Sequence, residues 1–301
     1  MVLMFDSLYK KYKASDVVGK YIFVNVIVYV FLLLIGIFSV LLNMGGLSEL
    51  LLSFLELPAS WPMLAARPWT VFTYMFVHAN LWHILWNMVA LYFFGRIFLS
   101  FYSVRHFVGM YILGGLSGAL FFVLAYNMFP YFEPVLPYSH LVGASAAVLA
   151  IVVATAVRSP QYRINLLLVG SVKLSTFAMV TVAISFLMIA GENAGGNFAH
   201  LGGAFAGWLV ASRLNRGQDL TSLVNKPIDW VSSLLKRLRE PRVKKPKFTY
   251  TRGGRTADYE YNARKKADEA EVDRILEKIK QGGYASLSEE EKKRLFEASS
   301  K

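Results

Sequence analysis

Apolar residues in this chain gather in six long runs separated by polar connections. The runs cover residues 21–42, 81–99, 107–128, 143–157, 174–190 and 198–214. A helix needs about 20 residues to cross a hydrocarbon core of roughly 30 Å. The pattern therefore predicts an all-α polytopic membrane protein with a bundle of six transmembrane helices.

The fourth and sixth runs are shorter than the others. A helix of about 15 residues spans only about 22 Å. We therefore expect these two helices to begin below one membrane surface, at the bottom of a depression that water can enter.

The first long connection, residues 45–77, is not plainly hydrophilic. It contains a leucine-rich segment followed by Trp61, Arg67 and Trp69. Tryptophan and arginine beside leucines are typical of an amphipathic segment that lies in the membrane interface.

The sequence after the sixth run predicts a different kind of structure. Residues 228–238 place apolar side chains at helical spacing beside basic ones, which favours a helix on the anionic inner leaflet. Residues 240–254 combine many bases with prolines and predict a flexible linker. Residues 263–280 predict a charged helix, and residues 288–291 form a capping box that starts a last helix.

We accordingly expect four parts along the chain. Residues 1–20 form an N-terminal segment, 21–214 the membrane domain, 215–254 an amphipathic helix with a basic linker, and 255–301 a small helical tail. The tail has the residues of a docking module or of a solvated extension.

Charged residues differ between the two sides of the predicted bundle. One side receives Lys10, Lys11, Lys13, Lys20, Arg96, Arg105, Arg158, Arg163 and Lys173. The other side receives Glu49, Glu56, Glu133 and Glu192, with Arg67 as its only strong base. By the positive-inside rule both termini are cytoplasmic. The second, fourth and sixth spans then all begin at the same outer level.

The composition supports a membrane protein and removes several kinds of chemistry. Hydrophobic residues make up 55% of the chain and its mean hydropathy is +0.42, which is the balance of a multi-spanning protein. The chain has no cysteine, so disulfides, thiolate metal sites and a cysteine nucleophile are excluded. The net charge of +12 invites a nucleic-acid partner, but the bases flank the spans, so we expect none.

Five polar side chains fall at the outer level where a membrane helix rarely tolerates them. They are His78, His83 and Asn87 around the start of the second span, Ser145 at the start of the fourth and His200 near the start of the sixth. Taken alone, Ser145 is most simply a small packing residue, because a hydroxyl can bond back to its own helix. Three histidines, an asparagine and a serine at one depth indicate a site.

The residue types limit what this site can do. Metal binding by three histidines is conceivable, but no Asp or Glu lies nearby in the sequence and HExxH is absent, so we expect no metal. Nucleophilic catalysis needs a hydroxyl, a base and oxyanion donors, which Ser145, His200 and the pair His83 with Asn87 supply. No carboxylate in the spans can complete a triad, which leaves a dyad. His140, five residues before Ser145, is a competing base.

These residues resemble those of a known family, the rhomboid intramembrane serine proteases. The resemblance covers about residues 67–209. Each motif alone is weak, but the three motifs together, in the order in which they occur here, are highly specific. The motifs are His78-x4-His83-x3-Asn87, Gly143-Ala144-Ser145, and Ala199-His200-Leu201-Gly202-Gly203 with Gly207.

The resemblance implies a serine-type endopeptidase that needs no cofactor. Ser145 would attack the scissile carbonyl, and His200 would take its proton and return it to the leaving amine. The backbone N–H of Ser145 with the side chains of His83 and Asn87 would hold the oxyanion. His78 matches a residue with a structural role in the family.

Small residues around the nucleophile match the same pattern. Gly143 and Ala144 would let the substrate backbone and the sixth helix come close to Ser145. Glycines four apart, such as Gly203 and Gly207, let helices approach one another, and we assign them packing rather than chemistry.

Three positions depart from the family pattern. Ala146 stands where glycine is common and adds a methyl group beside the oxyanion. Leu149 stands where an aromatic often stacks on the base, so other neighbours, for example Phe198, would orient His200. Trp69-Thr70 replaces a tryptophan-arginine pair, so the first loop must be anchored differently.

We therefore expect an integral multi-pass protein of the bacterial inner membrane that cleaves transmembrane segments of other membrane proteins near the outer side. The family implies substrates with helix-weakening residues and a small residue before the cut. Its other partners would be the lipid bilayer and, for the basic tail, the anionic inner leaflet.

Two alternatives belong to other functional classes. A catalytically inactive rhomboid-like protein would bind client transmembrane helices without cutting them, but it would not need both Ser145 and His200. A transporter or channel would carry polar side chains at mid-depth in several spans, whereas here they cluster near one surface.

Overall fold

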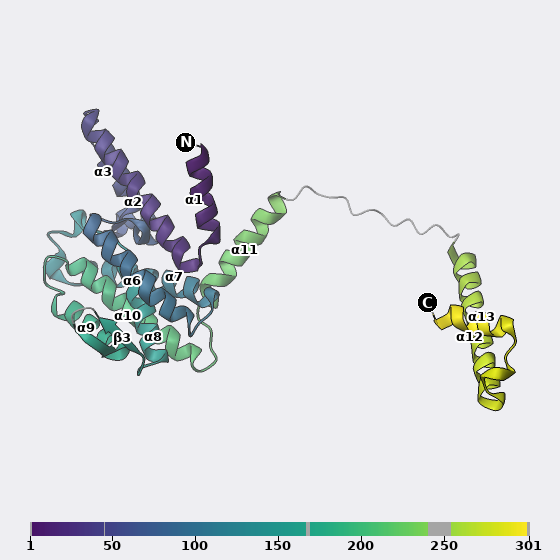
Figure 1. The fold of residues 1–301 in the computed structure, drawn as a ribbon. Coiled ribbons are helices and arrows are strands. Elements are labelled where there is room, and N and C mark those ends of the chain that lie inside the picture. The colour runs from purple at the N-terminus through teal and green to yellow at the C-terminus, as the bar shows by residue number, and fades with distance from the viewer. Residues whose placement is uncertain (1, 45, 167–168, 240–253, 300–301) are drawn as a thin grey trace. The chain divides into compact units, whose positions relative to one another are not determined.

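The computed structural model describes residues 2–44, 46–166, 169–239 and 254–299. The chain divides into two compact units, Met1–Arg239 and Glu240–Lys301, which are described separately (Figure 1). The predicted linker, residues 240–254, lies outside the described residues except for its last residue.

The first unit is predominantly helical. Its α-helices are α1 (Val2–Ala14), α2 (Val17–Leu41), α3 (Leu47–Leu55), α4 (Trp61–Ala66), α5 (Thr70–Thr73), α6 (Leu81–Leu99), α7 (Val104–Met128), α8 (Ser145–Arg158), α9 (Leu174–Leu187), α10 (Ala194–Leu214) and α11 (Ser222–Arg239). Short 3-10 helices are η1 (Tyr74–Phe76), η2 (Pro130–Phe132) and η3 (Leu136–Tyr138). Each of the six predicted spans corresponds to one helix, namely α2, α6, α7, α8, α9 or α10.

Among the described residues, three helices are long and apolar enough to cross a membrane. They are α2, α6 and α7, and two shorter helices, α8 and α9, are also apolar. The prediction of a short fourth helix is confirmed, because α8 has 14 residues. The prediction of a short sixth helix is wrong, because α10 has 21 residues.

The sixth helix is longer than predicted because its first turn is small and polar rather than apolar. Residues 194–197 read Ala-Gly-Gly-Asn and precede the apolar run 198–214, but they already belong to the helix. A Cβ built at Gly195 would lie 2.9 Å from the Phe122 ring, so this turn packs closely against α7. Packing inside the protein therefore extends the helix beyond its hydrophobic pattern.

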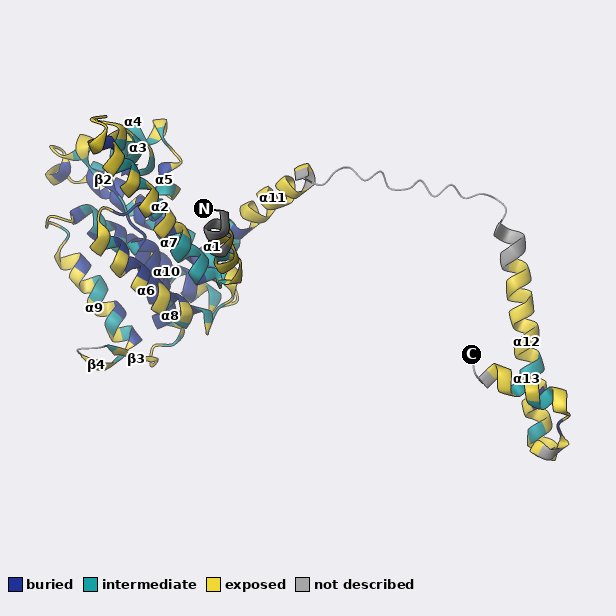
Figure 2. Ribbon diagram, turned by 45° about the horizontal axis from the view of Figure 1, so that its top comes forward, coloured by how far each residue is buried: buried dark blue, intermediate teal, exposed yellow. Residues whose placement is uncertain are grey.

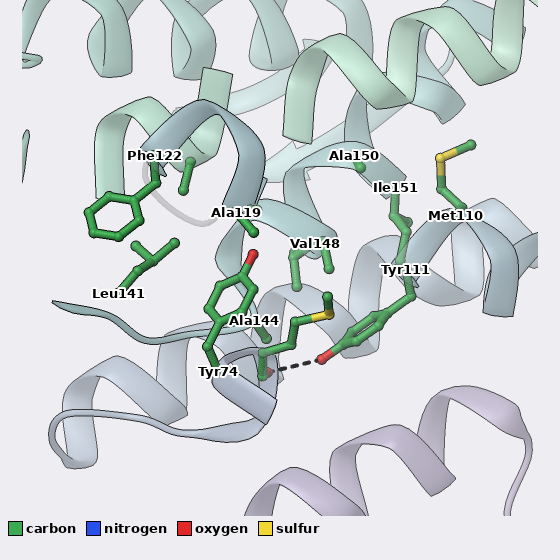
Figure 3. Close-up of a cluster of buried hydrophobic side chains, with 14 of the residues drawn as sticks. Tyr74, Met110, Tyr111, Ala119, Phe122, Leu141, Ala144, Val148, Ala150 and Ile151 are labelled. Carbon is green, nitrogen blue, oxygen red and sulfur yellow. Dashed lines mark hydrogen bonds between the residues drawn. The ribbon is translucent and has the colours of Figure 1, made fainter. Parts of the chain in front are cut away.

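Helices α7, α8 and α10 form the centre of the unit (Figure 2). Every residue of α8 from Ala146 to Val152 is buried. Figure 3 shows the buried cluster at this centre, in which large side chains such as Tyr74 and Tyr111 lie around small ones such as Ala144 and Ala150. Their hydroxyls donate to the carbonyls of Gly115 and Met75, at 2.6 and 3.3 Å, so neither buried phenol lacks a partner.

Two short antiparallel ribbons, which the sequence analysis did not predict, join distant connections. Strand β1 (Leu57–Pro58) pairs with β2 (His140–Leu141), with Leu57 opposite Leu141 and Pro58 opposite His140. Strand β3 (Arg163–Leu166) pairs with β4 (Gly170–Lys173) between α8 and α9. The first ribbon ties the long connection between α2 and α6 to the segment just before Ser145.

Side chains of the following segment cap the end of α3. Arg67, Trp69 and Thr73 donate to the carbonyls of Ser53, Phe54 and Leu55, at 2.6, 2.8 and 2.7 Å. These carbonyls belong to the last turn of α3, where helical partners are missing. Thus Arg67 and Trp69, rather than an arginine directly after the tryptophan, anchor the first loop.

Helix α11 leaves the bundle from the end where α7 begins. Asn225 donates to the carbonyl of Arg105 at 3.0 Å, and Arg105 forms an ion pair with Asp229 at 2.6 Å. Large apolar residues on this helix are exposed, including Trp230 and Leu238. The predicted amphipathic helix of residues 228–238 is therefore present as part of α11.

The second unit contains α12 (Gly254–Gly282), η4 (Tyr284–Ser286) and α13 (Glu289–Ser299). The predicted capping box is confirmed, since Ser288 N–H donates to the Glu291 carboxylate at 2.8 Å and Glu291 N–H donates to Ser288 Oγ at 3.3 Å. Ile275 and Leu287 are buried between the helical segments. The unit thus has a small apolar core of its own.

Candidate functional site

A serine and a histidine from different helices form a direct hydrogen bond at one end of the bundle. His200 Nε2 lies 2.8 Å from Ser145 Oγ, across 55 positions of sequence. Ser145 is the first residue of α8, and His200 lies in the second turn of α10. Both side chains are partly buried. A hydroxyl held this way can pass its proton to the imidazole.

Gly143 sets the position of Ser145. Its φ is +121°, a conformation that side chains other than hydrogen rarely allow, and α8 begins two residues later. A Cβ at Gly143 would lie 2.7 Å from His83 Nε2. Glycine is therefore required here both for the backbone turn and for the close approach of the His83 ring.

Small residues bring α10 close enough for His200 to reach Ser145. A Cβ at Gly203 would collide with the carbonyl oxygen of Ala146, and one at Gly207 with that of Ala150. Backbone contacts of this kind, repeated every four residues, are typical of tightly packed membrane helices.

His83 faces the same turn from α6. Asn80 caps this helix by accepting from His83 N–H at 2.9 Å. The backbone N–H of Ala79 points at His83 Nδ1 at 3.4 Å, a long contact that favours Nδ1 as the acceptor. The ring proton then belongs on Nε2, the atom beside Gly143.

Asn87 lies one turn further along α6 and is buried. Its amide nitrogen donates to the carbonyl of His83 at 2.9 Å. A side-chain amide nitrogen carries two hydrogens, so one remains for another acceptor. Asn87 and His83 can therefore both act as donors from the same face of α6.

Two further histidines, His78 and His140, have other surroundings. His78 is buried and its ring meets that of His83 edge to face, with centroids 5.1 Å apart. His140 is exposed on β2, and its Nδ1 lies 3.0 Å from the carbonyl of Tyr138. The structure thus brings His200, rather than the competing base His140, to the Ser145 hydroxyl.

A second serine, absent from the sequence analysis, contacts the other ring nitrogen of His200. Ser185 on α9 is buried, and its Oγ lies 3.2 Å from His200 Nδ1. Phe198, considered as an orienting neighbour, stacks against Phe129 instead. The position of Ser185 near the end of the fifth predicted span is the one signal in the sequence, and it gives the depth of the side chain but not its direction.

Among the described residues, no carboxylate is hydrogen-bonded to Ser145 Oγ or to the ring of His200. Glu56 lies just before β1, where burial raises the pKa of its carboxyl above the usual value and nearby His140 offsets only part of that rise. The described residues contain no cluster of three His, Cys, Asp or Glu side chains that could hold a metal ion. The site therefore offers hydroxyl, imidazole and amide groups.

Comparison with known proteins gives two family matches. Residues 255–301 match a family of unknown function, DUF6576. No match was found among curated proteins. Residues 65–216, which include every residue of the site and half of the chain, match the rhomboid domain. The chain therefore belongs to the rhomboid family of integral membrane proteins.

Proposed function

We propose that this protein is an intramembrane serine endopeptidase that cleaves transmembrane segments of other membrane proteins with a Ser145–His200 dyad. The observation that carries the proposal is the 2.8 Å hydrogen bond between Ser145 Oγ and His200 Nε2. A packing serine needs no imidazole partner, since it can bond to its own helix.

The reaction proceeds in two steps. His200 Nε2 accepts the Ser145 proton as Oγ attacks the scissile carbonyl, and the imidazolium then protonates the leaving amine. Water deprotonated by His200 hydrolyses the resulting acyl-enzyme and releases Ser145. In both steps His200 Nε2 takes a proton from the attacking group and gives it to the leaving group, which is the amine in the first step and Ser145 Oγ in the second.

Negative charge on the carbonyl oxygen needs donors on the side of Gly143. The backbone N–H of Ser145 lies in the first turn of α8, where helix N–H groups have no intrahelical partner. His83 Nε2 approaches the same turn, and Asn87 follows on the same face of α6. These three donors form the oxyanion hole in our proposal.

The charge pattern and the helix order support six spans with both termini in the cytoplasm. Helices α6, α8 and α10 then all enter the membrane from the outer side, so the dyad lies near that surface. A substrate helix must unwind locally there, because hydrogen bonds shelter its peptide bonds. We accordingly expect substrates with helix-weakening residues and a small residue before the cut.

A fluorophosphonate probe tests the proposal because it reacts with activated serines whatever the natural substrate is. We expect covalent labelling of the detergent-solubilised wild type, and none of Ser145→Ala or His200→Ala. Ser100→Ala, which changes an exposed serine after α6, is the matched control and should label like the wild type.

Cleavage of single-span fusion proteins in liposomes distinguishes protease from binder. Wild type should release two fragments and Ser145→Ala none. A folded wild type that neither labels nor cleaves, yet retains the fusion proteins, would favour the inactive client-binding alternative. Equal labelling of Ser145→Ala would assign the reactivity to another residue.

A further inference from the structure

We propose that Ser185 is the positioning residue that holds His200 in the tautomer able to accept the Ser145 proton. The inference rests on the proposed function and concerns the ring nitrogen that faces away from the nucleophile. His200 is bonded on both sides, by Ser145 Oγ at Nε2, 2.8 Å away, and by Ser185 Oγ at Nδ1, 3.2 Å away.

The direction of the hydrogen bonds follows from the proton that a hydroxyl carries. Ser185 Oγ also lies 3.1 Å from the carbonyl oxygen of Thr181, one turn back on α9. A carbonyl only accepts, so Ser185 must donate to it in order to satisfy that contact. Its oxygen is then an acceptor, and His200 Nδ1 must carry the ring proton.

The opposite arrangement makes one bond fewer. If Ser185 donated to Nδ1, the ring proton would be on Nε2 and the carbonyl of Thr181 would lose the hydroxyl. Nε2 would then donate to Ser145 and could not act as a base. The arrangement that makes all three hydrogen bonds, Ser185 to Thr181, His200 to Ser185 and Ser145 to His200, is thus also the one in which His200 can act as a base. Hydrogen bonds in such a chain polarise and strengthen one another.

The surroundings explain why a neutral hydroxyl is used. Ser185 is only 3% exposed, so an unpaired carboxylate there would bear a large desolvation cost. Leu149 is buried in an apolar cluster that also holds Ala178 of α9 and Ala204 of α10. Orientation of the imidazole by hydrogen bonding replaces, in this chain, the stacking that a larger side chain at position 149 would give.

Steady-state kinetics on Ser185→Ala test this role. This variant leaves the buried Nδ1–H of His200 without an acceptor, so we expect kcat to fall by about 10- to 100-fold. KM should change little, because Nδ1 faces away from the substrate. Ser185→Thr retains the hydroxyl and should restore most of the lost rate.

Thr155→Val is the matched control for removal of a buried hydroxyl. Thr155 is 1% exposed and its hydroxyl donates to Ile151, four residues back, at 2.7 Å, but it lies ten residues beyond Ser145 on α8. We expect wild-type kcat for this variant and similar thermal stability for both. A folded Ser185→Ala with wild-type kcat would overturn the proposal and leave the dyad unaffected.

The nitrogen-15 spectrum of labelled histidine gives a readout independent of cleavage. His200, assigned from the signals lost in His200→Ala, should show a protonated Nδ1 and an unprotonated Nε2 in the wild type. Ser185→Ala should mix the two tautomers. A wild-type spectrum with the proton on Nε2 contradicts the role of Ser185, whereas failure of the proposed function would appear separately as an inactive wild type.

Discussion

Two donors of the proposed oxyanion hole lie on successive turns of α6 but are held by different means. The ring of His83 is held by the contact of the Ala79 backbone N–H with Nδ1 and by the close packing of Gly143. The amide of Asn87 is fixed by its bond to the carbonyl of His83. Their positions are therefore established before substrate arrives, which is what electrostatic stabilisation of a transition state requires.

Replacing Asn87 with alanine tests whether it acts in the transition state. Removal of one oxyanion donor typically costs about 100- to 1,000-fold in kcat, so Asn87→Ala should be slow but not inactive, unlike Ser145→Ala. The measurement is the cleavage rate of a fusion protein in liposomes.

Asn25→Ala is the matched control for this variant. Asn25 is a buried amide on α2 that donates to Tyr21, four residues back, at 2.8 Å, as Asn87 does to His83. It should retain wild-type kcat in the folded fraction. Equal losses in the two variants would mean that Asn87 only supports the fold.

The sequence predicted that four residues form one site, because the direction of each span fixes the depth of its residues in the membrane. These residues are Ser145, His200, His83 and Asn87. The same reasoning places Ser185 near the outer end of its span, yet depth alone does not say which way it points. The polar residues of the run 174–190 are four hydroxyl side chains, which can bond back to their own helix, so they do not identify its inward direction. That direction follows only from the packing of α9 against α10.

Among the elements, α8 and α10 are the pair whose spacing decides whether the site exists. Backbone meets backbone at Gly203 and Ala146, and again at Gly207 and Ala150. Ser117 on α7 adds a hydrogen bond to the carbonyl of Gly202 at 2.7 Å. Ser145 and His200 are thus carried on two helices whose backbones are in contact.

Gly203→Ala should separate these helices. Its Cβ would collide with the carbonyl oxygen of Ala146, and overpacking of this kind costs about 1 to 3 kcal/mol. We expect a lower melting temperature and a cleavage rate reduced by at least about tenfold, since the shift of α10 moves His200. Thermal unfolding in detergent and cleavage assays measure both effects.

Gly36→Ala provides the comparison on α2. A Cβ there would meet only Ser48 Oγ, at 3.7 Å, which is an ordinary contact. This variant should keep its activity and should not be less stable, because alanine is the better helix former. Full activity of Gly203→Ala would show that the bundle can relax around the extra methyl group.

Hydrophobic periodicity predicted the helices of the bundle but neither ribbon. Strands of two and four residues, such as β1 and β3, are too short for an alternating pattern to be recognised. Their pairing also depends on contacts between distant connections, as between Leu57 and Leu141. The capping box at Ser288 was predictable because both of its bonds are local.

That capping box makes the α12–α13 element sensitive to acid. The hydrogen bond from Lys278 and that from the Ser288 backbone lower the pKa of Glu291 from 4.5 to about 2. A lowered pKa in the folded state means that the stabilisation is complete above about pH 4.5 and is lost as the pH falls through about 2. Amide hydrogen exchange of tail peptides in the full-length protein should show protection that decreases over this window.

Glu291→Gln removes the charge at every pH. Amide hydrogens in the tail of this variant should exchange faster than those of the wild-type tail at pH 6. Their protection should no longer decrease as the pH falls from 4.5 to 2. Unchanged exchange in the wild type over this window would mean that the carboxylate contributes nothing to the element.

The least apolar of the six helices, α10, packs against three other helices, α7, α8 and α9. α10 is not among the helices that qualify as spans by composition, yet its Gly202, Gly203, Ala206 and Gly207 are buried. A helix that contacts other helices rather than lipid needs small residues more than hydrophobic ones. A criterion based on hydropathy therefore fails to identify α10 as a membrane span. We expect α10 to cross the membrane.

Single cysteines can test this topology because the chain has none of its own. Tyr138, 82% exposed after α7, and Arg216, exposed after α10, lie on opposite sides if all six helices cross. A membrane-impermeant maleimide added to intact cells should label Tyr138→Cys at once, and Arg216→Cys only after permeabilisation. Labelling of both from outside would mean that α10 does not cross, whereas labelling of Arg216→Cys alone would reverse the orientation and place the dyad near the cytoplasm.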